Sequence, residues 1–262
     1  MSTDIIRTTA KPNFAMLDRI HNDGYMAIDG LFAEDYANII VNEINRLIDA
    51  GIITALLENN IDDQSTEWLR STGAAFGEAD GGILYRRSLA FRQMFDALKD
   101  WARSYNRIAS QQGRAMIAAD GIELYWNKVI NNWSGLKLHR DNRRFTSALM
   151  AFDQSDFRHQ ALLLRKITIS GYFRERDQSG ERASDSGGAL VVHLPADRLP
   201  PSKKGSFDVL LSDHNQGAVF LGDDCLHGVS RMTNAGVRYS FQAFFPELRA
   251  WQALLAKYSN ER

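Results

Sequence analysis

The second half of this chain is built from short runs of apolar and β-branched residues, separated by turn-forming residues. Runs of this length and composition predict strands, and no helical pattern separates one run from the next. Seven of them follow one another: 122–130, 136–138, 167–173, 189–194, 207–211, 218–221 and 238–245. Because parallel strands need long, usually helical crossovers, we expect antiparallel sheets that close into a sandwich, a jelly roll or a barrel.

Amphipathic helices are predicted in front of these strands. After a short strand at 24–28, apolar residues recur at helical spacing until Gly51: Tyr36, Ile39, Ile40, Ile44, Leu47 and Ile48. A second helix is predicted from Phe91 to about residue 112, before Gly113, and a short helix at 251–258 ends the pattern. The fold class is therefore mainly β, with the N-terminal helices packed against one sheet.

The composition gives no sign of an internal boundary. The chain has five prolines, no Gly/Ser linker and no repeat, so we expect a single domain over residues 1–262. A net charge of −1 lacks the basic excess of a dedicated nucleic-acid binder, and no run approaches the roughly 18 uncharged apolar residues of a membrane span. One cysteine, Cys225, and an N-terminus without an apolar core predict a cytoplasmic protein with no disulfide framework.

Two His-x-Asp pairs are candidates for a metal site. On a strand, positions i and i+2 project from the same face, so both side chains of such a pair can reach one ion. His139 and Asp141 form one pair at the end of a predicted strand, and His21 and Asp23 form the other. Since His21 precedes every predicted strand of the second half, we expect a surface turn there and place the metal site at His139 and Asp141.

The downstream pattern is more specific than the pair alone. A glycine-flanked strand at 217–222 is followed by His227, and Arg238-Tyr239-Ser240 lies on the last long strand. Together with His139 and Asp141, this order resembles the iron(II)/2-oxoglutarate-dependent dioxygenases. The segment 23–32 is similar to the start of the phytanoyl-CoA dioxygenase-like branch, and the Gly-Gly-Ala-Leu run at 187–190 resembles a strand start common in the whole superfamily. The chain therefore resembles the phytanoyl-CoA dioxygenase-like or prolyl-hydroxylase-like branch.

The resemblance implies a double-stranded β-helix, a cupin-like jelly roll. It implies that His139, Asp141 and His227 bind iron(II), and that Arg238 and Ser240 hold the co-substrate 2-oxoglutarate. Two imidazoles and one carboxylate leave positions on the iron for the 2-oxo acid and for O2, and a guanidinium suits a buried carboxylate. The implied activity is hydroxylation of a small molecule, with release of succinate and CO2. We expect an amino acid, a carrier-bound amino acid or a specialised-metabolite intermediate as substrate.

Further residues are candidates for the pocket. Asn127 lies on the strand that leads toward His139, where a side-chain amide could donate a hydrogen bond to 2-oxoglutarate. Arg143 and Arg144 follow the ligand pair at the expected mouth of the barrel, where one could pair with an anionic substrate group, and Trp133 precedes the same strand. Arg231 is the rival of Arg238, but it lies in a polar loop. Most other basic residues between 142 and 182 are expected on a solvated face.

Two other functions share part of this pattern. A nucleic-acid demethylase of the AlkB-like branch would use the same iron and co-substrate residues, but it needs a basic groove that the overall charge does not favour. A non-enzymatic, cupin-like metal-binding jelly roll would use the His/Asp cluster alone. Arg238 and Ser240 disfavour the second alternative, because a metal site by itself has no need of a carboxylate-binding pair. The oligomeric state stays open.

Overall fold

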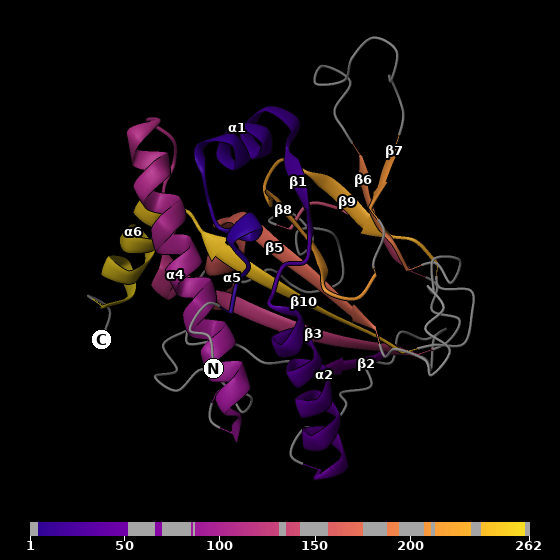
Figure 1. Cartoon of the computed structure of the whole chain (residues 1–262). Coiled ribbons are helices and arrows are strands. Elements are labelled where there is room, and N and C mark those ends of the chain that lie inside the picture. Colours follow the sequence, from indigo (N-terminus) through magenta and orange to yellow (C-terminus); the bar gives the residue numbers. More distant parts are fainter. Residues whose placement is uncertain are drawn as a thin grey trace.

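Two antiparallel sheets form the centre of the molecule (Figure 1). The computed structural model describes residues 5–51, 66–69, 85, 87–130, 135–141, 157–174, 188–193, 207–210, 213–231 and 237–259. The larger sheet has the strand order β1-β8-β5-β10-β3-β2, and the smaller one has the order β4-β9-β6-β7. The strands are β1 Tyr25–Asp29, β2 Thr66–Leu69, β3 Glu123–Ile130, β4 Leu136–His139, β5 Arg165–Arg174, β6 Leu190–His193, β7 Phe207–Leu210, β8 Gln216–Leu221, β9 Leu226–Val229 and β10 Val237–Pro246. All strand pairs among these residues are antiparallel, which confirms the predicted fold class.

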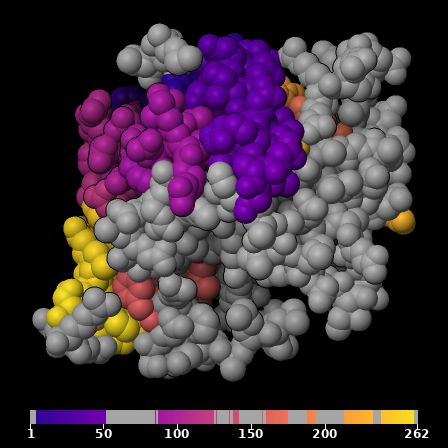
Figure 2. Space-filling model, turned by 90° about the horizontal axis from the view of Figure 1, so that it is seen from below, coloured from indigo at the N-terminus to yellow at the C-terminus, as the bar shows by residue number. Residues whose placement is uncertain are grey.

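Helices pack against the larger sheet and against one another. They are α1 Phe14–Asp23, α2 Glu34–Asp49, α4 Leu89–Gln111, α5 Phe157–Leu163 and α6 Leu248–Ser259, with 3-10 turns η1 Thr8–Ala10 and η3 Ala119–Gly121. Figure 2 shows α2 and α4 beside each other on the lower face, with α6 at its edge. Among the described residues, none of these helices combines the length and the apolar character that a membrane span requires.

Local capping explains where the N-terminal helices begin and end. The Asn13 side chain accepts a hydrogen bond from the backbone N–H of Met16 (2.8 Å), and Ser88 caps α4 in the same way. Gly24 ends α1 in the left-handed region at φ 85°. His21 therefore lies in the last turn of a helix, and the predicted surface turn at this position was wrong. Its Nε2 atom is 3.0 Å from the Tyr105 hydroxyl oxygen, so this His-x-Asp pair has a structural contact with α4.

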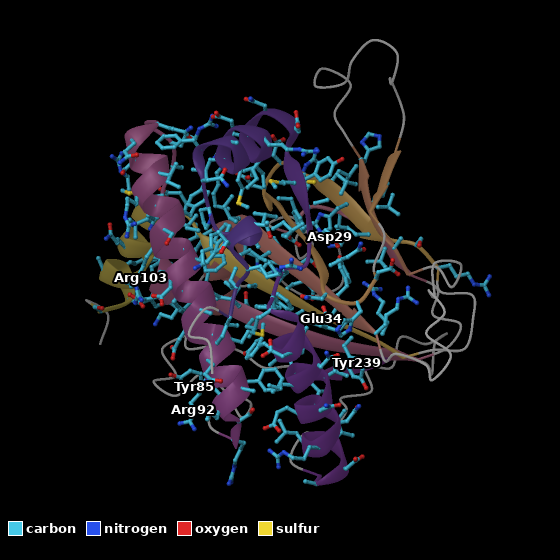
Figure 3. All side chains as sticks on the ribbon, in the orientation of Figure 1. Asp29, Glu34, Tyr85, Arg92, Arg103 and Tyr239 are labelled. Carbon is cyan, nitrogen blue, oxygen red and sulfur yellow. The ribbon has the colours of Figure 1, made fainter. Side chains whose placement is uncertain are left out.

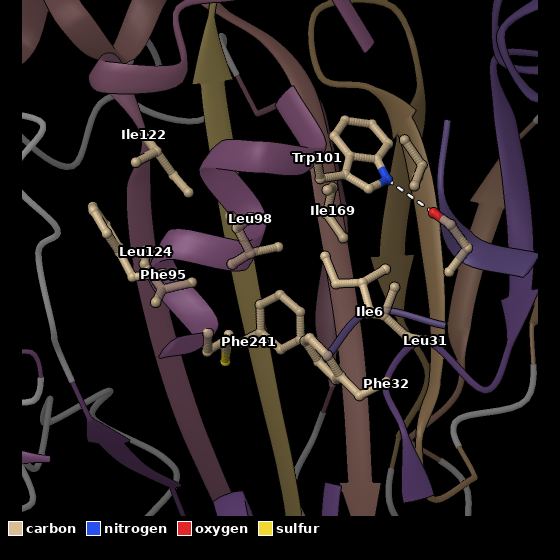
Figure 4. Packing of buried hydrophobic residues seen from close by; sticks show 14 of the residues in the cluster. Ile6, Leu31, Phe32, Phe95, Leu98, Trp101, Ile122, Leu124, Ile169 and Phe241 are labelled. Atoms are coloured by element: carbon tan, nitrogen blue, oxygen red, sulfur yellow. Dashed lines mark hydrogen bonds between the residues drawn. The ribbon is translucent and has the colours of Figure 1, made fainter. Parts of the chain in front are cut away.

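The main hydrophobic core lies between the helices and the outer face of the larger sheet (Figure 4). Alternate residues of β5 and β10, such as Ile169 and Phe241, pack there against Leu98 and Trp101 of α4. Trp101 also donates from Nε1 to the carbonyl oxygen of Ala10 (2.9 Å). On the same face Tyr239 points toward α2, where its hydroxyl donates to Asn45 (Figure 3). One face of these strands thus packs against the helices.

The inner face of the larger sheet has a different character. Because side chains alternate along a strand, the residues between those of the core point toward the smaller sheet. They are buried and several are polar: Thr168, Ser170, Tyr172, Arg238 and Ser240. Phe220 and Tyr172 meet Leu190 and Val192 of β6 in a second, smaller cluster. The space between the two sheets is therefore lined by buried polar side chains.

Candidate metal centre

Three metal-binding side chains meet at one end of the space between the sheets. His139 is the last residue of β4, Asp141 lies just beyond it, and His227 is on β9. The two strands pair so that His139 stands opposite His227, with ring centroids 4.5 Å apart and ring planes inclined by 50°. One ligand atom from each of the three residues lies within 4.8 Å of the others. The structure therefore brings together the three residues that the sequence placed at the metal.

The arrangement of these atoms suits one metal ion. Oδ1 of Asp141 lies 3.7 Å from Nε2 of His139 and 3.5 Å from Nε2 of His227, so the three atoms can face a common point. Two imidazoles and one carboxylate on one side leave the remaining positions of an octahedral ion open. Among the residues that the structure describes, the group has three members, whereas a closed tetrahedral zinc site has four protein ligands. The donor set fits iron(II).

The backbone around β9 sets the orientation of His227. Cys225 is buried, and its carbonyl oxygen lies 3.1 Å from Nδ1 of His227. In the tautomer that donates from Nδ1 to this carbonyl, Nε2 carries the lone pair and faces Asp141. The Phe220 ring packs 4.4 Å from the imidazole and limits its rotation. The cysteine thus acts through its backbone, and its thiol is not needed as a ligand.

Arg238 is a cation buried between the sheets. It is 1% exposed, and its guanidinium carbon lies 4.6 Å from the centre of the Tyr172 ring. Burial lowers the pKa of Arg238 to about 10, although the hydrogen bond and charge interaction with Tyr172 oppose this shift. An anionic group bound beside Arg238 would offset the cost of burying its charge. A carboxylate is the ligand that this site favours.

Hydroxyl groups surround the same place. Ser240 is buried and stands opposite Tyr172 of β5 and opposite Asn127 of β3. The Ser170 hydroxyl donates to the Tyr172 hydroxyl oxygen (3.0 Å), and burial raises the pKa of Tyr172, so this phenol keeps its proton at neutral pH. Buried hydroxyl groups and a buried guanidinium thus lie on the same face of the larger sheet, and both are groups that donate hydrogen bonds to carboxylates.

Comparisons with known proteins identify this architecture. No family model and no curated protein matches the chain. Among solved structures, a prolyl hydroxylase from Trichoplax adhaerens, in complex with a hypoxia inducible factor peptide fragment, superposes with a TM-score of 0.59 and 14% identity over 91% of this chain and 90% of that one. The fold is that of the iron(II)/2-oxoglutarate oxygenases.

Two further structures share the oxygenase fold. A prolyl-4-hydroxylase from Pseudomonas putida superposes with a TM-score of 0.57 and 15% identity, over 89% of this chain and 98% of that one. The non-heme alpha-ketoglutarate-dependent epimerase SnoN from nogalamycin biosynthesis gives a TM-score of 0.55 and 11% identity, over 90% and 84%. The likeness therefore covers most of each chain, and it includes proteins that catalyse different reactions.

The other predicted pocket residues have mixed outcomes. Trp133, Arg143 and Arg144 lie outside the described residues. Asn127 is in β3 opposite Ser240, but its side chain also lies outside what the structure describes. Arg231 is exposed just beyond β9, whereas Arg238 is buried. A buried carboxylate needs a buried cation, so burial favours Arg238 over Arg231.

Two features of the inner face escaped the sequence analysis. Thr168, Ser170 and Tyr172 alternate with apolar residues along β5, a pattern that places them on one face of the strand. The sequence does not show that this face meets the smaller sheet. Arg165, which we expected on a solvated face, is instead buried and donates from Nη2 to Oε2 of Glu123 (2.6 Å). The expectation was wrong because Arg165 begins β5 beside β10, where its guanidinium stacks 3.7 Å from the centre of the Phe244 ring.

Proposed function

We propose that this protein is an iron(II)- and 2-oxoglutarate-dependent oxygenase that hydroxylates an unactivated C–H bond of a small molecule. The observation that carries the proposal is that the structure brings His139, Asp141 and His227 together and also buries the cation Arg238. A metal-binding jelly roll without this activity would need only the first part. Iron(II) bound here supplies the coupling between oxidative decarboxylation of 2-oxoglutarate and oxidation of the substrate.

The reaction balances with one molecule of each reactant. Substrate C–H, 2-oxoglutarate and O2 give substrate C–OH, succinate and CO2. In our proposal Arg238 pairs with the distal carboxylate of 2-oxoglutarate, while the hydroxyls of Ser240 and Tyr172 donate to the same group. Phe220 packs against His227, and the apolar cluster to which it belongs excludes water from the space between the two sheets. These residues bind and orient, and none of them needs to transfer a proton.

The proposed substrate is a small molecule. We propose a free or carrier-bound amino acid or a specialised-metabolite intermediate, acted on in the cytoplasm by a single domain. The Trichoplax enzyme is complexed with a peptide, and SnoN is an epimerase. Peptide hydroxylation and epimerisation are therefore the competing outcomes that a product analysis must distinguish.

One spectroscopic experiment tests the proposed chemistry. Iron(II) and 2-oxoglutarate are added without oxygen, and we expect a visible metal-to-ligand charge-transfer band. The band should disappear in His139→Ala. His21→Gln is the matched control, because His21 belongs to the other His-x-Asp pair and lies in α1 beside Tyr105; this variant should keep the band. A wild-type protein without the band would refute the proposed activity. If the band is present, a screen for succinate release identifies the substrate.

A further inference from the structure

The two carboxylate oxygens of Asp141 have different surroundings. Oδ1 is the atom that faces the Nε2 atoms of His139 and His227, at 3.7 and 3.5 Å. Oδ2 points the other way and accepts a hydrogen bond from the hydroxyl of Thr168, at 2.6 Å. Both residues are buried, so this contact is shielded from water. The carboxylate thus has one oxygen free to face a metal and one held by the protein.

Thr168 occupies a rigid place in the larger sheet. It lies within β5, where its neighbours in register are Phe244 of β10 and Phe220 of β8. A β-branched side chain has few χ1 rotamers, and a strand that is paired on both sides cannot shift easily. The hydroxyl of Thr168 is therefore presented at a fixed position. It joins the larger sheet to a centre whose two histidines come from the smaller sheet.

Gly222 leaves the room for this contact. Its backbone N–H donates to the carbonyl oxygen of Lys166 (2.9 Å), and its own carbonyl oxygen accepts from the backbone N–H of Asp141 (2.9 Å). A Cβ atom at Gly222 would lie 3.0 Å from Oγ1 of Thr168 and 3.5 Å from Cβ of Asp141. The glycine holds the backbone of Asp141, while its missing side chain leaves space for the threonine hydroxyl.

We propose that Thr168 is a positioning residue that makes Asp141 a ligand through Oδ1 alone, with Gly222 as the position that must stay small. This inference rests on the proposed metal centre. A carboxylate can offer one oxygen or both to a metal ion, and a hydrogen bond to one oxygen orients the other. With Oδ2 engaged by Thr168, Asp141 occupies a single coordination position. More positions then stay open for the co-substrate and for O2.

The proposal is tested by metal binding alone. Cobalt(II) is titrated into the metal-free protein without 2-oxoglutarate, and its affinity and visible spectrum are measured. Thr168→Val keeps the shape and removes the donor, and we expect affinity to fall about 10- to 100-fold. Thr168→Ser keeps the hydroxyl and should stay within about threefold of wild type. Gly222→Ala crowds the same hydroxyl and should weaken binding in the same direction as Thr168→Val.

Each outcome has a distinct meaning. If the valine variant binds cobalt(II) as tightly as wild type, or if the serine variant loses as much affinity as the valine variant, the positioning role is wrong while the proposed activity stands. If cobalt(II) binding by the wild-type protein does not depend on His139, the proposed activity itself is wrong. Urea unfolding of each metal-free variant shows whether that variant is folded. If Thr168→Val does not fold, the cobalt(II) affinity of Gly222→Ala decides the test in its place.

Discussion

The guanidinium group of Arg238 lies over the ring of Tyr172, 4.6 Å from its centre, in the space between the two sheets. This pair is what distinguishes the molecule from a simple metal-binding jelly roll. The ring stabilises a cation that has lost its hydration on burial, and the planar guanidinium has the geometry that binds a carboxylate through two hydrogen bonds. A buried cation of this kind is a strong attractor for a carboxylate, which leads to the first prediction.

Replacing Arg238 should strongly weaken co-substrate binding. Removing one member of a buried charge pair costs about 2–5 kcal/mol, so Arg238→Met is expected to weaken 2-oxoglutarate binding by at least about 30-fold. Calorimetric titration of 2-oxoglutarate into the metal-loaded protein measures this. Arg231→Met is the control, because Arg231 is exposed. The affinity of this variant for 2-oxoglutarate should stay within about twofold of wild type. Equal losses in both variants would contradict the assignment of Arg238.

The stability of the protein should fall at alkaline pH because of buried tyrosines. Burial raises the pKa of Tyr105 to about 12, compared with 10.0 for an exposed tyrosine. The unfolded chain therefore releases a proton between pH 10 and 12 that the folded chain retains. The contribution of Tyr105 to the free energy of unfolding is therefore fully present below pH 10. It falls by about 2–3 kcal/mol as the pH rises toward 12. Urea unfolding at pH 9 to 11.5 should show a shallower decline in Tyr105→Phe, and parallel curves would disprove the effect.

Removing one member of the buried pair of Glu123 and Arg165 should lower the free energy of unfolding more than replacing both members with apolar residues. Glu123→Leu alone leaves a buried guanidinium without its carboxylate and should lower the free energy of unfolding by about 3–5 kcal/mol. Adding Arg165→Met to this variant should recover most of the loss. The exposed pair of Asp100 and Arg103 has the same 2.6 Å separation, yet Asp100→Asn should cost under about 1 kcal/mol. Similar costs for the two single variants would mean that burial does not control the strength of these pairs.

A side chain at Gly171 should disrupt the contact between β5 and β10. Gly171 stands opposite Phe241, and a Cβ atom there would overlap the phenyl ring. Gly171→Ala is expected to destabilise the fold by about 1–3 kcal/mol. Phe241→Leu removes the part of the ring that would be overlapped, so the double variant should lose less than the sum of the two single variants. Additive losses in thermal or urea unfolding would show that the ring moves aside instead.

Pattern and spacing predicted most of the secondary structure. Predicted strands at 122–130 and 238–245 correspond to β3 and β10, and the helices before them correspond to α2 and α4. The helix α1 was missed because only Met16, Leu17 and Ile20 are buried along it, which is too few for a clear stripe. The strand β9 was missed because it has only four residues and two of them are His227 and Gly228.

Only some residues of the candidate site could be predicted from the sequence. His139, Asp141, His227 and Arg238 could be proposed because their order along the chain is itself a pattern. Thr168 and Tyr172 have no such order, and their importance follows only from the face of β5 on which they lie. On a strand buried on both sides, alternation separates two faces but does not say which face meets helices and which meets the other sheet.

The amino-acid sequence by itself determined the antiparallel, mainly β class and the residue types available for a metal and a carboxylate. Local rules suffice for this, because periodicity, turn residues and side-chain chemistry act over a few positions. Only the tertiary structure decided that β4 pairs with β9, which sets His139 opposite His227, and that the hydroxyl of Thr168 reaches Asp141 from the larger sheet. Contacts between strands far apart in the chain depend on how whole faces pack, and no local pattern encodes that packing.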